Sequence, residues 1–157
     1  MQNSTAPPRP AVIRKEPASL LVAPHLPRDG LPSFSWDATR RALAGLPGGA
    51  LNIAHEAVDR HAQGQRAERV AIHWLGADGG EQRISYRELQ RRCNRVANTL
   101  ADLGLARGDR LFVLMPRLPQ LYAAVLGGLK AGLVVCPMFS AFGPEPIATR
   151  MSLGAAR

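Results

Sequence analysis

The strongest pattern of apolar and polar residues lies within residues 108–145. Residues 110–115 are a short apolar run between a Gly-Asp turn signal and a proline, which is typical of a buried strand. Pro119 stands where the first turn of a helix tolerates proline, and apolar residues then recur at helical spacing up to Gly132. Residues 133–136 form a second β-prone run. Two apolar strands joined by one helix predict a parallel βαβ unit with a right-handed crossover.

A hairpin followed by a long helix is predicted just before this unit. Residues 70–75 and 82–85 are β-prone and flank a glycine-rich turn. Ser85 and Glu88 match the capping box, in which each side chain bonds the backbone N–H of the other residue. The helix that follows is expected to end at Gly104, and its apolar residues share one face: Leu89, Cys93, Val96, Leu100 and Leu103.

Three shorter amphipathic patterns predict helices over residues 36–44, 53–63 and 144–153. The residues expected to face inward are Trp36, Leu43 and Ala44 in the first helix, Ile53, Ala57, Val58 and Ala62 in the second, and Ile147, Ala148 and Met151 in the third. Because helices and strands alternate along the second half of the chain, the predicted fold class is α/β.

Proline separates the first part of the chain from the rest. Eight of the thirteen prolines fall in the first fifty residues, and Leu20-Leu21-Val22 is the main apolar cluster before residue 33. Such a segment buries too little apolar surface to offset the entropy lost on ordering. We therefore expect a flexible, proline-rich arm over residues 1–33 and a folded part over residues 34–157.

The net charge of +8 comes almost entirely from arginine, with eighteen arginines and two lysines against twelve acidic residues. The excess is spread along the chain, with six basic and three acidic residues before Leu51 and fourteen and nine from there on. Its densest point is one helix face with Arg87, Arg91, Arg92 and Arg95. A basic surface can bind nucleic acid or an anionic membrane, but a face opposite the apolar stripe is typical of a solvated helix surface, which we favour.

Cysteine content and apolar tract length indicate a cytoplasmic protein without a membrane span. Cys93 and Cys136 lie far apart in apolar segments without metal-ligand spacing, as expected of buried thiols in a reducing compartment. No signal peptide is apparent at the N-terminus. The longest apolar tract, residues 118–139, is interrupted by glycines, a lysine and a proline, which argues against a transmembrane helix.

Two motifs suggest reactive or binding sites but are incomplete. His55 and Asp59 are four residues apart on a predicted helix and could share a metal ion, yet the His-Glu-x-x-His pattern has Asp59 in its last position and a third ligand is lacking. An exposed helix is the favoured interpretation. Residues 127–132 are glycine-rich but lack the spacing of a phosphate loop, and close packing of the helix on the sheet explains their glycines better.

Residues 137–143 are the candidate binding loop, because ligands of parallel sheets collect at the carboxyl ends of strands. Phe139 and Phe142 supply aromatic faces that can stack on a purine, and small residues between them let backbone approach a ligand closely. The alternative, in which the phenylalanines simply pack under the sheet, is equally compatible with the sequence.

The chain from about Trp36 onward resembles the N-terminal beginning of the AMP-forming acyl-CoA synthetases, in particular the acetyl-CoA synthetase branch. The resemblance rests on the order and spacing of five stretches: LNIAHEAVDRH at 51–61, ISYREL at 84–89, GDR at 108–110, MP at 115–116 and FSAFGPE at 139–145.

This resemblance implies a ligase that joins a carboxylate such as acetate to coenzyme A in two steps, with ATP and Mg²⁺. The carboxylate first attacks ATP to give an acyl adenylate and pyrophosphate, and the thiol of coenzyme A then displaces AMP. The family's loop that matches Phe139, Ser140 and Ala141 lines the coenzyme A nucleotide site, with Ser140 and Ala141 standing where many members have glycine.

The family's phosphate loop, adenine and ribose motifs and adenylation lysine have no counterpart in these 157 residues, since Lys15 and Lys130 are the only lysines. We therefore expect an N-terminal fragment of an acetate–CoA ligase: an incomplete part of the AMP-dependent synthetase domain over 34–157, inactive alone and with no assigned catalytic or metal-binding residue. Two alternatives remain, a basic non-enzymatic module that binds nucleic acid or a partner, and a truncated product without function. Acetate-like carboxylate, ATP and coenzyme A are the expected partners, and nucleic acid and membrane are not.

Overall fold

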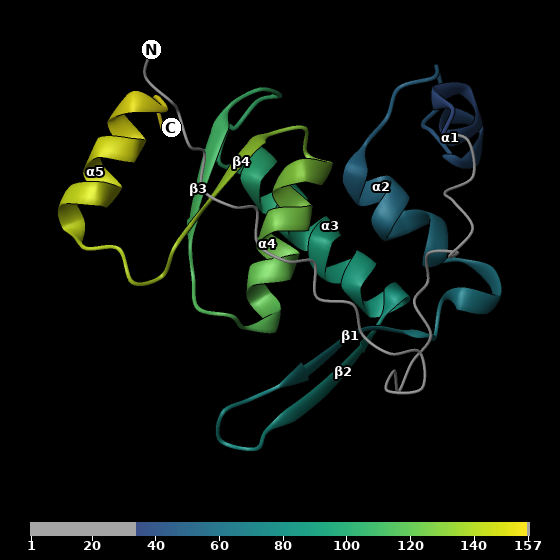
Figure 1. Cartoon of the computed structure of the whole chain (residues 1–157), viewed down its shortest axis with the longest axis horizontal. Coiled ribbons are helices and arrows are strands. Elements are labelled where there is room, and N and C mark those ends of the chain that lie inside the picture. The colour runs from purple at the N-terminus through teal and green to yellow at the C-terminus, as the bar shows by residue number, and fades with distance from the viewer. Residues whose placement is uncertain (1–33, 157) are drawn as a thin grey trace, which may run out of the picture. The chain divides into compact units, whose positions relative to one another are not determined.

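The computed structural model describes residues 34–156, and the chain divides into two compact units, Met1–Thr39 and Arg40–Arg157. The proline-rich arm expected over residues 1–33 lies outside the described residues. Along the chain, the helices are α1 (Trp36–Ala42), α2 (Ile53–Ala57), α3 (Tyr86–Asp102), α4 (Pro119–Lys130) and α5 (Pro144–Leu153), and the strands are β1 (Val70–Leu75), β2 (Glu81–Ser85), β3 (Arg110–Leu114) and β4 (Val134–Met138) (Figure 1). Short 3₁₀ turns at Asp59–His61 and Gly64–Arg66 follow α2.

The predicted βαβ unit is confirmed. Strands β3 and β4 pair in parallel, with Phe112 opposite Cys136, and α4 connects them. Figure 1 shows this pair of strands between α4 on one side and α5 on the other. Strand β4 runs through Met138, two residues further than the sequence pattern indicates, so the binding loop is shorter than expected and begins at Phe139.

Two glycines of α4 allow close packing of this helix on both its neighbours. A Cβ atom on Gly127 would lie 2.6 Å from Cβ of Val96 and 2.9 Å from the carbonyl oxygen of Cys93, both on α3. A Cβ atom on Gly128 would lie 2.8 Å from Leu111 of β3 and 2.9 Å from Val135 of β4. These distances leave no room for a side chain, which confirms that the glycines serve packing.

The predicted hairpin and the helix after it are confirmed. Strands β1 and β2 pair antiparallel, and Ser85 Oγ accepts a hydrogen bond of 3.2 Å from the backbone N–H of Glu88 at the start of α3. The carboxylate of Glu88 binds Arg92 at 2.9 Å and Arg91 at 2.6 Å. Both of its oxygens therefore face the arginines of the next helical turn, whereas a full capping box would direct them back to Ser85.

The hydrophobic core forms where the hairpin, α3 and the segment after α2 meet. Val58, Ile84, Leu89 and Cys93 are buried together, and Ala71, Ile72 and Leu126 pack against them. Of the apolar face predicted for α3, only Leu89 and Cys93, in the first half of the helix, are buried. Leu103 lies beyond the end of α3 and is 70% exposed.

The inward faces predicted for the three shorter helices need correction. Helix α2 ends at Ala57 and continues as a 3₁₀ turn, so its buried positions are Ala54, Val58 and Ala62, while Ile53 is 62% exposed. Neither α1 nor α5 contains a buried residue, and Trp36 is 72% exposed. Cys136 is only partly buried, unlike Cys93. Within residues 34–156, every helix is too short or too polar to cross a membrane.

Replacing Gly127 with alanine is expected to destabilise the fold. Alanine favours the helix by roughly 0.5–1 kcal/mol, but forcing a methyl group against the α3 backbone costs about 1–3 kcal/mol. The measurement is the urea midpoint followed by circular dichroism. Gly143→Ala is the matched control, because a Cβ there meets no atom within 4 Å; equal midpoints for the two variants would contradict the packing role of Gly127.

Candidate functional site

The predicted binding loop lies between the carboxyl end of β4 and α5, as expected. A turn closes it, in which the backbone N–H of Phe142 donates to the carbonyl oxygen of Phe139 at 3.0 Å. The two phenylalanine rings meet edge to face with their centroids 5.8 Å apart. The guanidinium carbon of Arg150 on α5 lies 4.3 Å from the centroid of Phe142.

The loop presents its residues outward. Phe139 is 62% exposed, and Ser140 and Ala141 are also exposed, so the phenylalanines are not both packed under the sheet. Phe142 holds Phe139 through the ring contact, and Arg150 places a positive charge beside the pair. This combination of an open aromatic face and a nearby cation can stack on a flat ring and attract an anion. The role of Phe139, Ser140 and Ala141 in binding coenzyme A stays a prediction.

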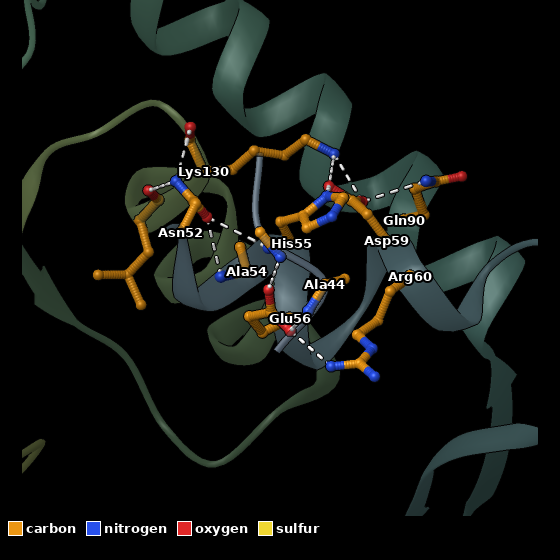
Figure 2. Close-up of polar contacts among 11 residues, drawn as sticks. Ala44, Asn52, Ala54, His55, Glu56, Asp59, Arg60, Gln90 and Lys130 are labelled. Atoms are coloured by element: carbon orange, nitrogen blue, oxygen red, sulfur yellow. Dashed lines mark hydrogen bonds and ion pairs between the residues drawn. The ribbon is translucent and has the colours of Figure 1, made fainter. Parts of the chain in front are cut away.

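A second group of polar side chains joins α2 to α3 and α4, and the sequence analysis missed it. Lys130, at the end of α4, donates to both carboxylate oxygens of Asp59 at 2.7 Å, and Gln90 of α3 donates to Asp59 Oδ1 at 3.1 Å (Figure 2). The side chains of Asp59 and Lys130 are 14% and 25% exposed. This partly buried salt bridge links the 3₁₀ turn after α2 to α4, and the hydrogen bond from Gln90 links the same turn to α3.

Asn52 makes the same connection through its amide group. Its Oδ1 atom accepts from the backbone N–H groups of Ala54 and His55 at the start of α2, at 2.9 and 3.2 Å. Its Nδ2 atom donates to the carbonyl oxygen of Leu129 at 2.9 Å. One side chain therefore bonds the free N–H groups that begin α2 and a carbonyl near the end of α4, which explains why the N-cap position is asparagine, an amide that both accepts and donates.

Glu56 organises the loop before α2. Its carboxylate accepts from the backbone N–H groups of Ala44 at 3.0 Å and Gly45 at 2.7 Å, and Arg60 binds it at 2.6 Å (Figure 2). The two backbone hydrogen bonds and the Arg60 guanidinium stabilise the ionised form, and they lower the pKa of Glu56 to about 2.

The interpretation of His55 and Asp59 as a metal pair has no structural support. His55 Nδ1 lies 3.9 Å from Asp59 Oδ2, but Lys130 holds both oxygens of that carboxylate. In the part of the chain that the structure describes, three or more His, Cys, Asp or Glu side chains nowhere gather as a metal site would require. The favoured alternative, an exposed helix, is also incomplete, because Asp59 points into the contact with α4.

Cys93 does not have the properties of a catalytic thiol. Burial raises its pKa to about 11, so the thiolate that would act as a nucleophile is not formed near neutral pH. Its position in the core beside Val58 and Leu89 is that of a small apolar residue.

Three of the four arginines on the basic face of α3 pair with neighbouring acids. Arg87 binds Glu68 at 2.6 Å, while Arg91 and Arg92 share Glu88. Two carboxylates thus balance about half of the positive charge of this face, and the preference for a solvated helix surface over a nucleic-acid surface stays a prediction.

Comparison with known proteins decides the family. Residues 58–157 match the family described as AMP-binding enzyme. The chain belongs to this family. The resemblance found from the sequence is thereby confirmed, and so is the α/β fold class of its adenylate-forming relatives.

The most similar curated relatives include two acetyl-coenzyme A synthetases. The chain is 35% identical to that of Bacillus subtilis over 119 residues, which cover 75% of the chain and 21% of the relative. It is 43% identical to that of Salmonella typhi over 104 residues, or 66% of the chain and 16% of the relative. The chain thus spans about a fifth or less of the length of these two relatives.

Solved structures with the same arrangement include a crystal structure of an acyl-CoA synthetase from Brucella canis, with a TM-score of 0.72 and 34% identity over 78% of the chain and 22% of that protein. The N-terminal subdomain of NpsA from Klebsiella oxytoca, solved in complex with anthranilyl-AMSN, matches 68% of the chain and 26% of that protein, with a TM-score of 0.58 and 27% identity.

The salt bridge between Asp59 and Lys130 is expected to show a coupling free energy of about 1–3 kcal/mol in a double-mutant cycle. Asp59→Asn and Lys130→Met each leave one charged partner partly buried, and the double variant removes both charges. The cycle is measured by urea unfolding of the three variants and the parent chain. Additive losses, with a coupling near zero, would show that the pair is not a structural link.

Acid unfolding is expected to report on Glu56. Because its pKa in the folded chain, about 2, lies below the usual value of 4.5, the ionised carboxylate stabilises the fold above pH 4.5 and that contribution is lost as the pH falls toward 2. Glu56→Gln should make stability less dependent on pH across this window. A parent-like profile for Glu56→Gln would refute the assignment.

Proposed function

We propose that the chain is the N-terminal part of an acetate–CoA ligase, which converts a carboxylate, ATP and coenzyme A to acyl-CoA, AMP and pyrophosphate. The observation that carries the proposal is the family match over residues 58–157, together with relatives at 35% and 43% identity that are named acetyl-coenzyme A synthetases. Residues 34–157 are then the opening portion of an AMP-dependent synthetase domain.

The loop after β4 is the proposed contact with coenzyme A. Phe139 would stack on the adenine ring, and the small side chains of Ser140 and Ala141 would let the nucleotide approach the backbone. The exposed ring of Phe139 and its position at the carboxyl end of β4 support this role. Arg150 supports it further, because its positive charge beside the loop favours a ligand that carries phosphates.

The 157-residue chain by itself is proposed to be inactive. Adenylation requires positive charge placed around the phosphates in the transition state. The sequence has no Pro-Lys-Gly phosphate loop, and it contains only two lysines, Lys15 and Lys130. Lys130 is committed to Asp59, which leaves it no free position for a substrate. ATP and Mg²⁺ would accordingly need binding groups outside these 157 residues.

A segment exchange with the Bacillus subtilis relative tests the proposal directly. Replacing the 119 matched residues of that enzyme with the corresponding segment of this chain should preserve acetate-dependent exchange of labelled pyrophosphate into ATP and the formation of acetyl-CoA. In the exchanged enzyme, Phe139→Ala should raise the KM for coenzyme A about fivefold or more, since stacking on a base contributes roughly 1–3 kcal/mol.

Two controls make the result decisive. Pyrophosphate exchange should be unchanged by Phe139→Ala, because adenylation precedes the use of coenzyme A. Leu153→Ala, a truncation of another exposed apolar side chain outside the loop, should change neither rate. The isolated chain should give no exchange. A folded but inactive exchanged enzyme, or exchange by the isolated chain, would overturn the respective part of the proposal.

A further inference from the structure

A polar cleft lies between β2, α3 and the start of α4, apart from the loop that follows β4. Its volume is about 490 Å³, within the range of roughly 300–1,000 Å³ that small-molecule sites occupy. The amide groups of Gln82 on β2 and Gln120 on α4 stand at its border with Arg92 and Arg95 of α3.

The charge of this cleft is not balanced. Glu88 is its acidic residue, and the carboxylate of Glu88 is shared between Arg92 at 2.9 Å and Arg91 at 2.6 Å. Arg95 has neither an ion pair nor a hydrogen bond to any residue in the range 34–156. Among the described residues, the cleft therefore carries one guanidinium without a partner and a second that is only partly neutralised.

The remaining lining is apolar. Val96 of α3 and Ala123 of α4 contribute to the walls, and Ala123 is buried. A bare inorganic anion would leave this part of the cleft unused. An organic molecule with an anionic group at one end would use both the guanidinium groups and the apolar wall.

We propose that this cleft binds a small organic phosphate, with its phosphoryl group at Arg95 and Arg92 and its apolar part against Val96 and Ala123. Phosphate suits the arrangement because guanidinium donors can bond two of its oxygens at once, and the amides of Gln82 and Gln120 can donate to the others. The site is independent of the proposed ligase loop, since none of its lining residues lies within 139–143.

Phenyl phosphate is a suitable probe, because it joins a phosphomonoester to a compact apolar ring. Calorimetric titration of the 157-residue chain in 0.15 M salt should give saturable binding with one site, tighter than that of inorganic phosphate. Arg95→Ala should weaken the binding at least tenfold. The exposed side chain of Arg95 has no partner among the described residues. The urea unfolding midpoint of the Arg95→Ala variant should therefore match that of the parent chain.

Arg87→Ala is the matched control, since Arg87 lies on the same helix and carries the same charge but binds Glu68 outside the cleft. It should change the affinity less than twofold. Equal losses from Arg87→Ala and Arg95→Ala would overturn the proposal in favour of diffuse attraction to the basic face. Absence of saturation up to 20 mM phenyl phosphate would also overturn the proposal. A dissociation constant of 20 mM corresponds to a binding free energy of about 2 kcal/mol.

Discussion

The close approach of α4 to its neighbours is the constraint on which the folded unit depends. Gly127 brings this helix against the α3 backbone, and Gly128 brings it against both strands of the parallel pair. The same helix therefore contacts α3 on one side and both strands of the sheet on another. The loop that starts at Phe139 and the cleft at Gln120 both take their places from this helix and the strands beside it.

The spacing of apolar residues predicted those helices and strands in which one regular spacing holds from end to end. The βαβ unit, the hairpin and α3 were all anticipated, because each contains a run of apolar residues bounded by a turn signal or a cap. The glycines of α4 were also assigned correctly to packing. The prediction for the α2 segment was right in part: Val58 and Ala62 are buried as expected, but Ala54 is buried in place of Ile53 and Ala57. A change from α-helix to 3₁₀ turn after Ala57 breaks the 3.6-residue period there.

The polar contacts were harder to foresee, because they join residues distant in sequence. The sequence around Asp59 does not indicate that Lys130 is its partner. A usable signal was the presence of a lysine in an otherwise apolar helix, in a chain with only two lysines. The double role of Asn52 was visible only in part, as a helix cap. The candidate loop was placed correctly at the end of β4, but the exposure of Phe139 and its contact with Phe142 required the structure.

The hydrogen bonds that Asn52 makes to both α2 and α4 also bear on how the chain folds. Its amide reaches from the start of α2 to the last turn of α4, across 77 positions in sequence, whereas the paired residues of the hairpin are 6 to 15 positions apart, from Leu75–Glu81 to Val70–Ser85. Closing a long loop costs more chain entropy than closing a short one, so local pairings form sooner. The hairpin and α3 are thus expected to form early. Helix α2 can pack against α4 only after α4 has formed. The hydrogen bond between Asn52 and α4 is therefore expected to form late in folding.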